Sequence, residues 1–154
     1  MKNMRQWHLI AGCVLVTSSF FAQATDWALF GCYAEANKTV KVPSKVVFMG
    51  NSITDGWWPN DSTFFINNQY VDRGISGQTT SEMLVRFRAD VINLKPKAVV
   101  ILAGTNDIAQ NNGYISLENA FGNIVSMVEL AKANNIKPIF CSVMPDYEFG
   151  WCKG

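Results

Sequence analysis

The chain has 154 residues, of which 49% are hydrophobic and 16% are charged. This length supports one hydrophobic core and is short for two full domains, so we expect a single globular domain and not a disordered chain. Thirteen Lys and Arg residues against twelve Asp and Glu residues give a formal charge of +1. The basic residues are scattered, which argues against a nucleic-acid partner. His8 is the only histidine, so an imidazole base or a histidine metal ligand would have to be that residue.

The first 24 residues have the layout of a secretory signal peptide. Lys2 and Arg5 precede an apolar stretch over residues 9–21, and the A-x-A pattern Ala22-Gln23-Ala24 allows cleavage after Ala24. We therefore expect residues 1–24 to be a signal peptide, residues 25–154 to be the mature domain, and the protein to be periplasmic or extracellular. Cleavage would leave 11 basic residues, 12 acidic residues and no histidine.

Two alternatives for this segment stay open. A retained transmembrane helix is disfavoured because Thr17, Ser18 and Ser19 interrupt the apolar run, which is shorter than the ~20 residues that cross a bilayer. A bacterial lipoprotein would be modified at Cys13, which follows Ile10-Ala11-Gly12, but the apolar run continues past that cysteine. Export with cleavage is the favoured interpretation.

Three cysteines remain after cleavage, and export would allow disulfides between them. Cys141 lies in the apolar run 139–144 and is expected to be a small buried side chain. Cys32 and Cys152 are therefore the candidate pair for a structural disulfide. Zinc is not expected, because the chain has neither C-x-x-C nor histidine spacing.

Strand and helix patterns alternate along the mature chain. Nearly continuous apolar runs predict strands at residues 45–49, 98–102 and 138–144, and a weaker pattern covers 69–72. One helix is predicted to begin with a capping box at Thr79 and Glu82 and to end near Pro96, a second to follow Ser116 and end near Asn135, and a shorter one to cover 27–36. This order predicts a doubly wound α/β/α sandwich with a parallel sheet, whose ligands bind at the carboxyl ends of the strands.

Three polar segments follow the first three predicted strands: Gly50-Asn51-Ser52, Arg73-Gly74-Ile75-Ser76-Gly77 and Gly104-Thr105-Asn106-Asp107. Acyl transfer needs a nucleophile and hydrogen-bond donors for the oxyanion. Ser52 offers a hydroxyl, Gly74 an open backbone N–H and Asn106 a carboxamide. Each segment alone is also explained by turn or helix-capping chemistry. Their joint occurrence at one sheet edge favours a catalytic site.

In this order the segments resemble the first three conserved blocks of the SGNH, or GDSL-type, hydrolases, close to the platelet-activating-factor acetylhydrolase-like branch of secreted bacterial esterases. The resemblance covers essentially the whole mature chain. It implies a flavodoxin-like fold with Ser52 as the nucleophile. It also implies an oxyanion hole formed by the Ser52 and Gly74 N–H groups and the Asn106 side chain.

The sequence departs from the family pattern in two places. Asn51 stands where the family usually has an acidic residue, which questions the geometry of the loop more than its chemistry. The Asp-x-x-His block of the family has no counterpart in the chain, and the residue matching Asp107 is structural in the family. We therefore expect the N-terminal part of a longer hydrolase, with the fold incomplete at its C-terminus and little activity as given.

The expected function is that of a secreted serine esterase acting on small acyl esters, with acetylated carbohydrates as candidate substrates and with no metal or cofactor. The alternative is a non-catalytic binding module or pseudoenzyme on the same fold. A nucleotide-binding protein is disfavoured because no glycine-rich phosphate loop follows the first strand. Trp57 and Trp58 could either line the site or pack against the sheet edge, and Tyr114 could lie at the rim of the site.

Overall fold

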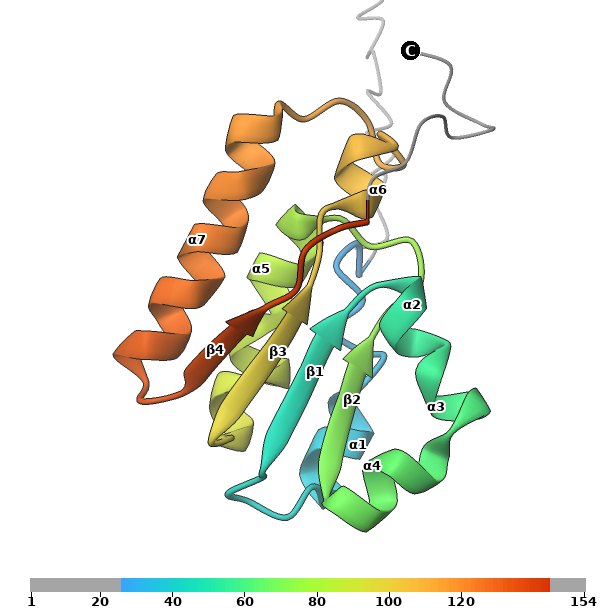
Figure 1. The fold of residues 1–154 in the computed structure, drawn as a ribbon, viewed down its shortest axis with the longest axis vertical. Helices are drawn as coiled ribbons and strands as arrows, with labels where there is room; N and C mark the ends of the chain where they lie inside the picture. The colour runs from blue at the N-terminus through green and yellow to red at the C-terminus, as the bar shows by residue number, and fades with distance from the viewer. Residues whose placement is uncertain (1–25, 145–154) are drawn as a thin grey trace, which may run out of the picture.

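A computed structural model describes residues 26–144 of the chain. Four parallel strands form one sheet in the order β2-β1-β3-β4 (Figure 1): β1 Val46–Gly50, β2 Tyr70–Gly74, β3 Ala98–Leu102 and β4 Lys137–Phe140. Gly50 is in register with Gly74 on one side and with Leu102 on the other. The three strands therefore end level with one another, and the segments that follow them begin at the same edge of the sheet.

Two strands differ from their predicted bounds by two or more residues, in both cases at the carboxyl end. The weakly predicted strand is a full strand that reaches Gly74, because it pairs with β1 up to Gly50. The strand predicted over 138–144 ends at Phe140. Its partner β3 ends at Leu102, and the N–H of the half-buried Cys141 makes the last hydrogen bond, to the Ile101 carbonyl at 2.9 Å. Cys141 therefore lies beyond the sheet and is not the buried strand residue that its apolar neighbours predict.

The two long helices begin where the sequence predicts. Helix α5 (Thr80–Asp90) opens with a capping box between Thr79 and Glu82, and the 3₁₀ turn η1 (Ile92–Leu94) carries the chain to Lys95. Helix α7 (Leu117–Ala133) begins after Ser116, whose hydroxyl accepts the Asn119 N–H at 3.2 Å. Polar caps followed by apolar residues at helical spacing are therefore sufficient to locate both helices.

The short helices were harder to predict. The helix expected over 27–36 is wrong in position: α1 is Ala34–Thr39, and turns precede it, since the Asp26 carboxylate accepts the N–H groups of Phe30 and Gly31. Between β1 and β2 the chain forms three helices that the sequence analysis did not predict, namely α2 (Ser52–Asp55), α3 (Trp57–Asn60) and α4 (Ser62–Asn68). A further one-turn helix, α6 (Thr105–Ile108), follows β3.

Alternating side chains of β1 define the two faces of the sheet. Val47 and Met49 are fully buried in the core cluster, which includes Met83 and Phe87 of α5. The Phe48 ring points to the opposite face and contacts aromatic rings of α3 and α4, with centroid distances of 5.5 Å to both Trp57 and Phe65. Figure 1 shows the sheet between α5 and α7 on one side and α2 to α4 on the other. The chain thus has the predicted α/β/α architecture.

Several predictions concern residues outside 26–144. The predicted signal peptide, with His8 and Cys13, lies there, and so does Cys152, so both the signal peptide and the disulfide with Cys32 stay predictions. Within the described range, no helix has the length and hydropathy needed to cross a bilayer.

Candidate functional site

Ser52 is the first residue of α2, directly beyond the carboxyl end of β1. The buried side chain of Asn51 caps this helix by accepting the Ile53 N–H at 3.3 Å. The amide at position 51 therefore supports the loop geometry without a negative charge. The Ser52 side chain is exposed, and its hydroxyl makes no hydrogen bond to the residues that the structure describes. It is free to meet a ligand at the sheet edge.

Asn106 lies in α6, at the carboxyl end of β3, and only 7% of its surface is exposed. Its amide is held from both sides: Nδ2 donates to the Gln78 carbonyl at 2.9 Å, and Oδ1 accepts from Asn111 Nδ2 at 2.8 Å. An amide nitrogen has two N–H bonds, so one donor remains after the bond to Gln78. The carboxamide is thus held in place, and its role as an oxyanion donor stays a prediction.

Asp107 has a different role from its neighbour. The side chain is 2% exposed and accepts hydrogen bonds from the N–H of Thr80, at 3.0 Å, and from its hydroxyl, at 2.6 Å. The carboxylate thus caps the first turn of α5 and fastens that helix to the end of β3. This is the structural role that the family resemblance implies.

Gly74 ends β2, but its N–H is not a free donor. It donates to Asp72 Oδ1 at 2.7 Å, so the prediction that it faces an oxyanion does not hold in this structure. The need for glycine has another cause: a Cβ at position 74 would lie 2.1 Å from the Asp55 backbone nitrogen. Gly74 therefore allows the close approach of α2 to β2.

Gly77, in the loop after β2, is the residue that the sequence analysis missed. It has φ +82°, a conformation that favours glycine, and its N–H donates no hydrogen bond within residues 26–144. Ser76, just before it, donates its N–H to Asp55 of α2 at 3.1 Å, and Gln78, just after it, holds Asn106. The open N–H of Gly77 therefore lies between the segments that carry Ser52 and Asn106. The second glycine of the 73–77 segment was the available signal.

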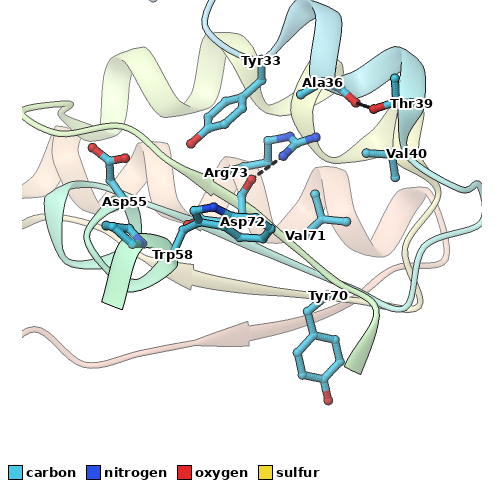
Figure 2. Close-up of a pocket in the computed structure, with 11 residues that line it drawn as sticks. Tyr33, Ala36, Thr39, Val40, Asp55, Trp58, Tyr70, Val71, Asp72 and Arg73 are labelled. Atoms are coloured by element: carbon cyan, nitrogen blue, oxygen red, sulfur yellow. Dashed lines mark hydrogen bonds between the residues drawn. The ribbon is translucent and has the colours of Figure 1, made fainter. Parts of the chain in front are cut away.

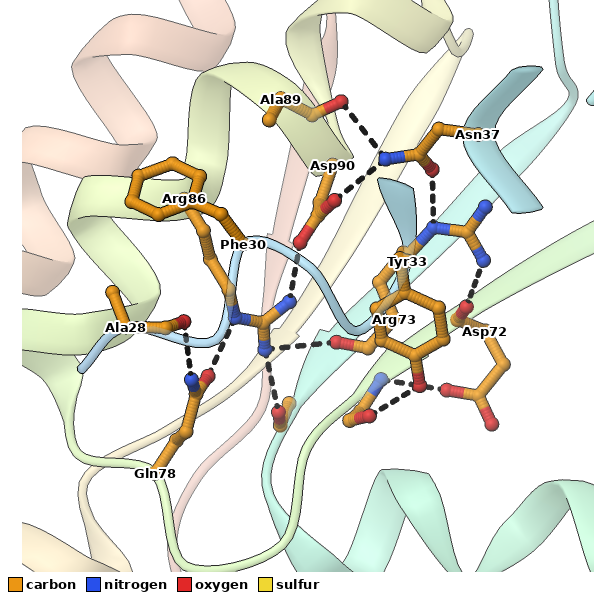
Figure 3. Close-up of polar contacts among 12 residues, drawn as sticks. Ala28, Phe30, Tyr33, Asn37, Asp72, Arg73, Gln78, Arg86, Ala89 and Asp90 are labelled. Carbon is orange, nitrogen blue, oxygen red and sulfur yellow. Dashed lines mark hydrogen bonds and ion pairs between the residues drawn. The ribbon is translucent and has the colours of Figure 1, made fainter. Parts of the chain in front are cut away.

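A buried arginine ties these segments together. Arg86 of α5 is fully buried, and it forms an ion pair with Asp90 at 2.9 Å. The rest of its guanidinium donates to the Gln78 side chain at 2.5 Å and to the carbonyls of Arg73 at 3.0 Å and Gly50 at 3.3 Å. Figure 3 shows how these partners surround it. The ends of β1 and β2 and the loop that holds Asn106 are thus fixed by one side chain.

A second cluster of polar side chains, formed by Tyr33, Asp72 and Arg73, lies beside Arg86 (Figure 3). Burial raises the pKa of the Asp72 carboxyl to about 6, although the hydrogen bond from the Gly74 N–H opposes the shift. Burial also raises the pKa of Tyr33 above its usual range, and the Tyr33 hydroxyl donates to the Gly74 carbonyl. Burial lowers the pKa of Arg73, whose guanidinium lies over the Tyr33 ring.

Residues 26–144 offer Ser52 no imidazole base, since the single histidine of the chain is His8. Nor does that range contain a cluster of three His, Cys, Asp or Glu side chains able to hold a metal ion.

The aromatic candidates divide between packing and exposure. The Trp57 ring stacks on Phe64 with centroids 4.7 Å apart, so it packs against the sheet layer. Trp58 is 44% exposed and lines a cavity beside β2, and Tyr114 is largely exposed after α6. A separate cavity of about 550 Å³ opens next to the site, between the neighbours of Ser52 and Asn106; its lining includes Ile53, Leu102, Thr105 and Val143.

Comparison with known proteins identifies relatives of this site and fold. Residues 48–154 match the model of the GDSL-like lipase/acylhydrolase family. A GDSL-like lipase structure from Bacteroides thetaiotaomicron is 53% identical, with a TM-score of 0.76 over 80% of this chain and 62% of that one. A candidate acylhydrolase structure from Bacteroides fragilis is 54% identical, with a TM-score of 0.80 over 83% of this chain and 64% of that one.

A third relative is a lipoprotein. The uncharacterized lipoprotein YqeF of Bacillus subtilis is 35% identical over 85 residues, which are 53% of this chain and 35% of YqeF. The chain therefore spans less than two thirds of the length of each of these three relatives.

Proposed function

Because this chain belongs to the GDSL-like lipase/acylhydrolase family, we propose that it forms the nucleophile-bearing part of a serine esterase. The observation that carries the proposal is the pairing of an exposed, unbonded Ser52 hydroxyl with an Asn106 amide that is fixed by two hydrogen bonds at the same sheet edge. An accessible nucleophile beside preorganised donors, once a base activates it, is the arrangement that acyl transfer requires.

In the proposed reaction the Ser52 oxygen attacks the ester carbonyl carbon, and its proton passes to a base. The carbonyl oxygen becomes an oxyanion that accepts hydrogen bonds from the Ser52 N–H, the free Asn106 N–H and a backbone N–H of the loop after β2. We assign this last donor to Gly77 in place of Gly74, because the Gly74 N–H is taken by Asp72. Collapse of the intermediate breaks the ester C–O bond, and the base gives its proton to the departing oxygen, which leaves as the alcohol. Water, activated by the same base, then hydrolyses the acyl-serine, which releases the carboxylic acid and restores the Ser52 hydroxyl.

The proposed substrates are small acyl esters, with acetyl groups on carbohydrate among them. The apolar cavity beside Ile53 has room for a short acyl group. Export is part of the proposal: it rests on the signal-peptide pattern of residues 1–24, and the likeness to a lipoprotein supports it.

The alternative is a binding module that holds acylated ligands without turnover. One observation favours it for the chain as given: residues 25–154 contain no histidine. A serine hydroxyl is a poor nucleophile at neutral pH without a base, so we propose that these residues alone hydrolyse esters very slowly.

Hydrolysis of a chromogenic acetyl ester separates the two functions. The proteins are residues 25–154, a chimera in which these residues are followed by an Asp-x-x-His block from a longer family member, and the chimera with Ser52→Ala. Ser126→Ala is the matched control, because this serine lies on α7 and bonds only to the Gly122 carbonyl of its own helix.

We expect activity only in the chimera and its Ser126→Ala form. Loss of the nucleophile should leave only the ~10³- to 10⁴-fold advantage over water that binding and the oxyanion hole provide. Full activity of the Ser52→Ala chimera would exclude the serine mechanism. A folded but inactive chimera would favour the binding module.

A further inference from the structure

A second cavity lies away from the strand ends, along β2, one of the two edge strands of the described sheet. It has a volume of about 420 Å³ and opens between α1, α3 and β2 (Figure 2). Its wall is mostly aromatic and aliphatic, and the aromatic residues are Tyr33, Trp58 and Tyr70. Three charged side chains also line it, namely Asp55, Asp72 and Arg73. A largely apolar cavity with a few polar groups is the usual form of a small-ligand site.

Arg73 supplies an unused donor in this wall. Its surface is 4% exposed, and its guanidinium lies 4.5 Å from the centroid of the Tyr33 ring. Nε donates to Asn37 Oδ1 at 2.8 Å and Nη1 donates to the Asp72 carbonyl, whereas the buried Nη2 has no hydrogen-bond partner among the described residues. A buried N–H without a partner costs free energy that a ligand oxygen would recover.

The neighbouring charges decide what kind of ligand can supply that oxygen. Asp55 and Asp72 line the same cavity, so an anion would face two carboxylates for one guanidinium. Asp72 accepts the Gly74 N–H through Oδ1, while no hydrogen bond to Oδ2 forms within residues 26–144. The wall therefore offers one donor and one acceptor close together, which suits hydroxyl groups, since each hydroxyl both donates and accepts.

The aromatic rings favour a ligand with flat apolar faces. Trp58 is 44% exposed while its ring packs on Phe65, with centroids 5.6 Å apart, so the ring is held and still presents open surface. Tyr70 and Tyr33 add further ring surface. A sugar ring combines C–H faces, which pack on aromatic rings, with hydroxyl groups at its edge.

We propose that this cavity is a binding site for a ring of a neutral saccharide, which packs on Trp58 and hydrogen-bonds to Arg73 and Asp72. The role of the saccharide, as the alcohol part of the ester, rests on the proposed function. Asp55, at the end of the helix that Ser52 begins, links the cavity to the nucleophile segment. Binding itself needs no turnover.

Calorimetry and NMR titration of the purified chain with xylobiose, cellobiose and chitobiose test the site, with digalacturonic acid as the anionic counterpart. The variants are Trp58→Ala and Arg73→Lys, and the matched control is Trp27→Ala, a tryptophan that is 59% exposed and does not line this cavity. Thermal melting checks the folding of each variant. If Arg73→Lys does not fold, the exposed Trp58 still tests the proposal.

We expect at least one neutral disaccharide to bind. Arg73→Lys should weaken the binding about tenfold or more, as loss of a charged hydrogen bond predicts, Trp58→Ala should weaken it about tenfold through loss of the ring contact, and Trp27→Ala should leave it unchanged. Tighter binding of digalacturonic acid would overturn the proposal, and so would absent binding or equal binding by Trp58→Ala. Saccharide binding together with an inactive chimera would refute the proposed esterase function and support the saccharide site. Serine-dependent hydrolysis without saccharide binding would support the esterase function and refute the saccharide site.

Discussion

Arg86 and Arg73 are both buried, on neighbouring elements of the fold, but they are used differently. Arg86 bonds to four different residues, one of them the carboxylate of Asp90, and has no buried nitrogen left over. Arg73 bonds to a side-chain amide and a carbonyl and keeps Nη2 unpaired within the described residues. A guanidinium whose nitrogens are all bonded, as in Arg86, fixes the backbone around it. A guanidinium with an unpaired nitrogen beside a cavity, as in Arg73, can bind a ligand.

The same contrast applies to the sheet edge that carries Ser52 and Asn106, the proposed catalytic site. Asn106 is anchored by Gln78, and Gln78 is in turn held by Arg86. The Ser52 hydroxyl and the Gly77 N–H make no such bonds to the part of the chain that the structure describes. A preorganised site needs donors that are fixed by other hydrogen bonds, as Asn106 is, beside groups that can still bond to a substrate. Four predictions test how far this division extends.

The largest effect is expected from removing each arginine in turn. Arg86→Met leaves the Asp90 carboxylate buried without its cation, so the free energy of unfolding should fall by about 3–5 kcal/mol. Arg73→Met loses two hydrogen bonds and should cost about 1–3 kcal/mol. Urea denaturation of the two variants measures the difference. Equal losses would show that the closed and open bonding patterns do not differ in stability.

The second prediction asks whether the Arg86 group serves the site. In the active chimera, Asn106→Ala should lower kcat by about 10²- to 10³-fold with little change in KM, because an oxyanion donor acts mainly in the transition state. The change in unfolding free energy should be small beside that of Arg86→Met. Asn119→Ala, at an exposed position of α7, is the control. Undiminished turnover of Asn106→Ala would remove this residue from the site.

Much of this fold could be predicted from the sequence, because its main elements are long or strongly patterned. Strands β1 and β3 are continuous apolar runs, and α5 and α7 carry polar caps before apolar residues at helical spacing. The helices α2 to α4 were missed, since each has seven residues or fewer, and α3 and α4 gain their order from ring packing around Phe48. Such packing has no periodic signal.

The site was predicted less completely than the fold. Ser52 and Asn106 follow strands and so could be placed at the sheet edge. Which glycine offers a free N–H could not be inferred, because that depends on the Asp72 side chain turning back onto Gly74. Arg86 was overlooked since an arginine in a helix is usually solvent-exposed.

The third prediction concerns Gly74, which lies between the two arginine groups: the preceding carbonyl accepts from Arg86, and its own carbonyl accepts from Tyr33. Gly74→Ala would force a Cβ to within 2.1 Å of the Asp55 backbone nitrogen. We expect a loss of about 1–3 kcal/mol, the usual cost of overpacking. Gly122→Ala on α7 has open space around its Cβ and should gain about 0.5–1 kcal/mol, as a helix interior allows. Calorimetric melting compares the two, and an equal response would contradict the close approach.

The smallest effect is expected from Asp72→Asn, and its sign depends on pH. The pKa of Asp72 is raised to about 6, chiefly by burial, so the folded state holds this proton more tightly than the unfolded state, whose pKa is about 3.9. The stability that this group contributes is present below the unfolded pKa and is lost as pH rises to about 6. Asparagine keeps an oxygen for the Gly74 N–H and has no charge to bury. The variant should therefore gain in melting temperature over the parent between about pH 4 and pH 6 and keep that gain at pH 7.

Asp61→Asn is the control with the opposite sign. Hydrogen bonds from the Thr63 hydroxyl and the Phe64 N–H lower the pKa of Asp61, so its contribution is present above the unfolded pKa and is lost as pH falls. Asp61→Asn should consequently melt below the parent at pH 7 and approach it at low pH. Two melting curves that diverge from the parent in opposite directions as pH rises would confirm that Asp72, beside Arg73, is held at an energetic cost. Parallel curves would mean that Asp72 titrates like an exposed carboxyl. The group around Arg73 would then contain no carboxylate whose pKa is altered by burial.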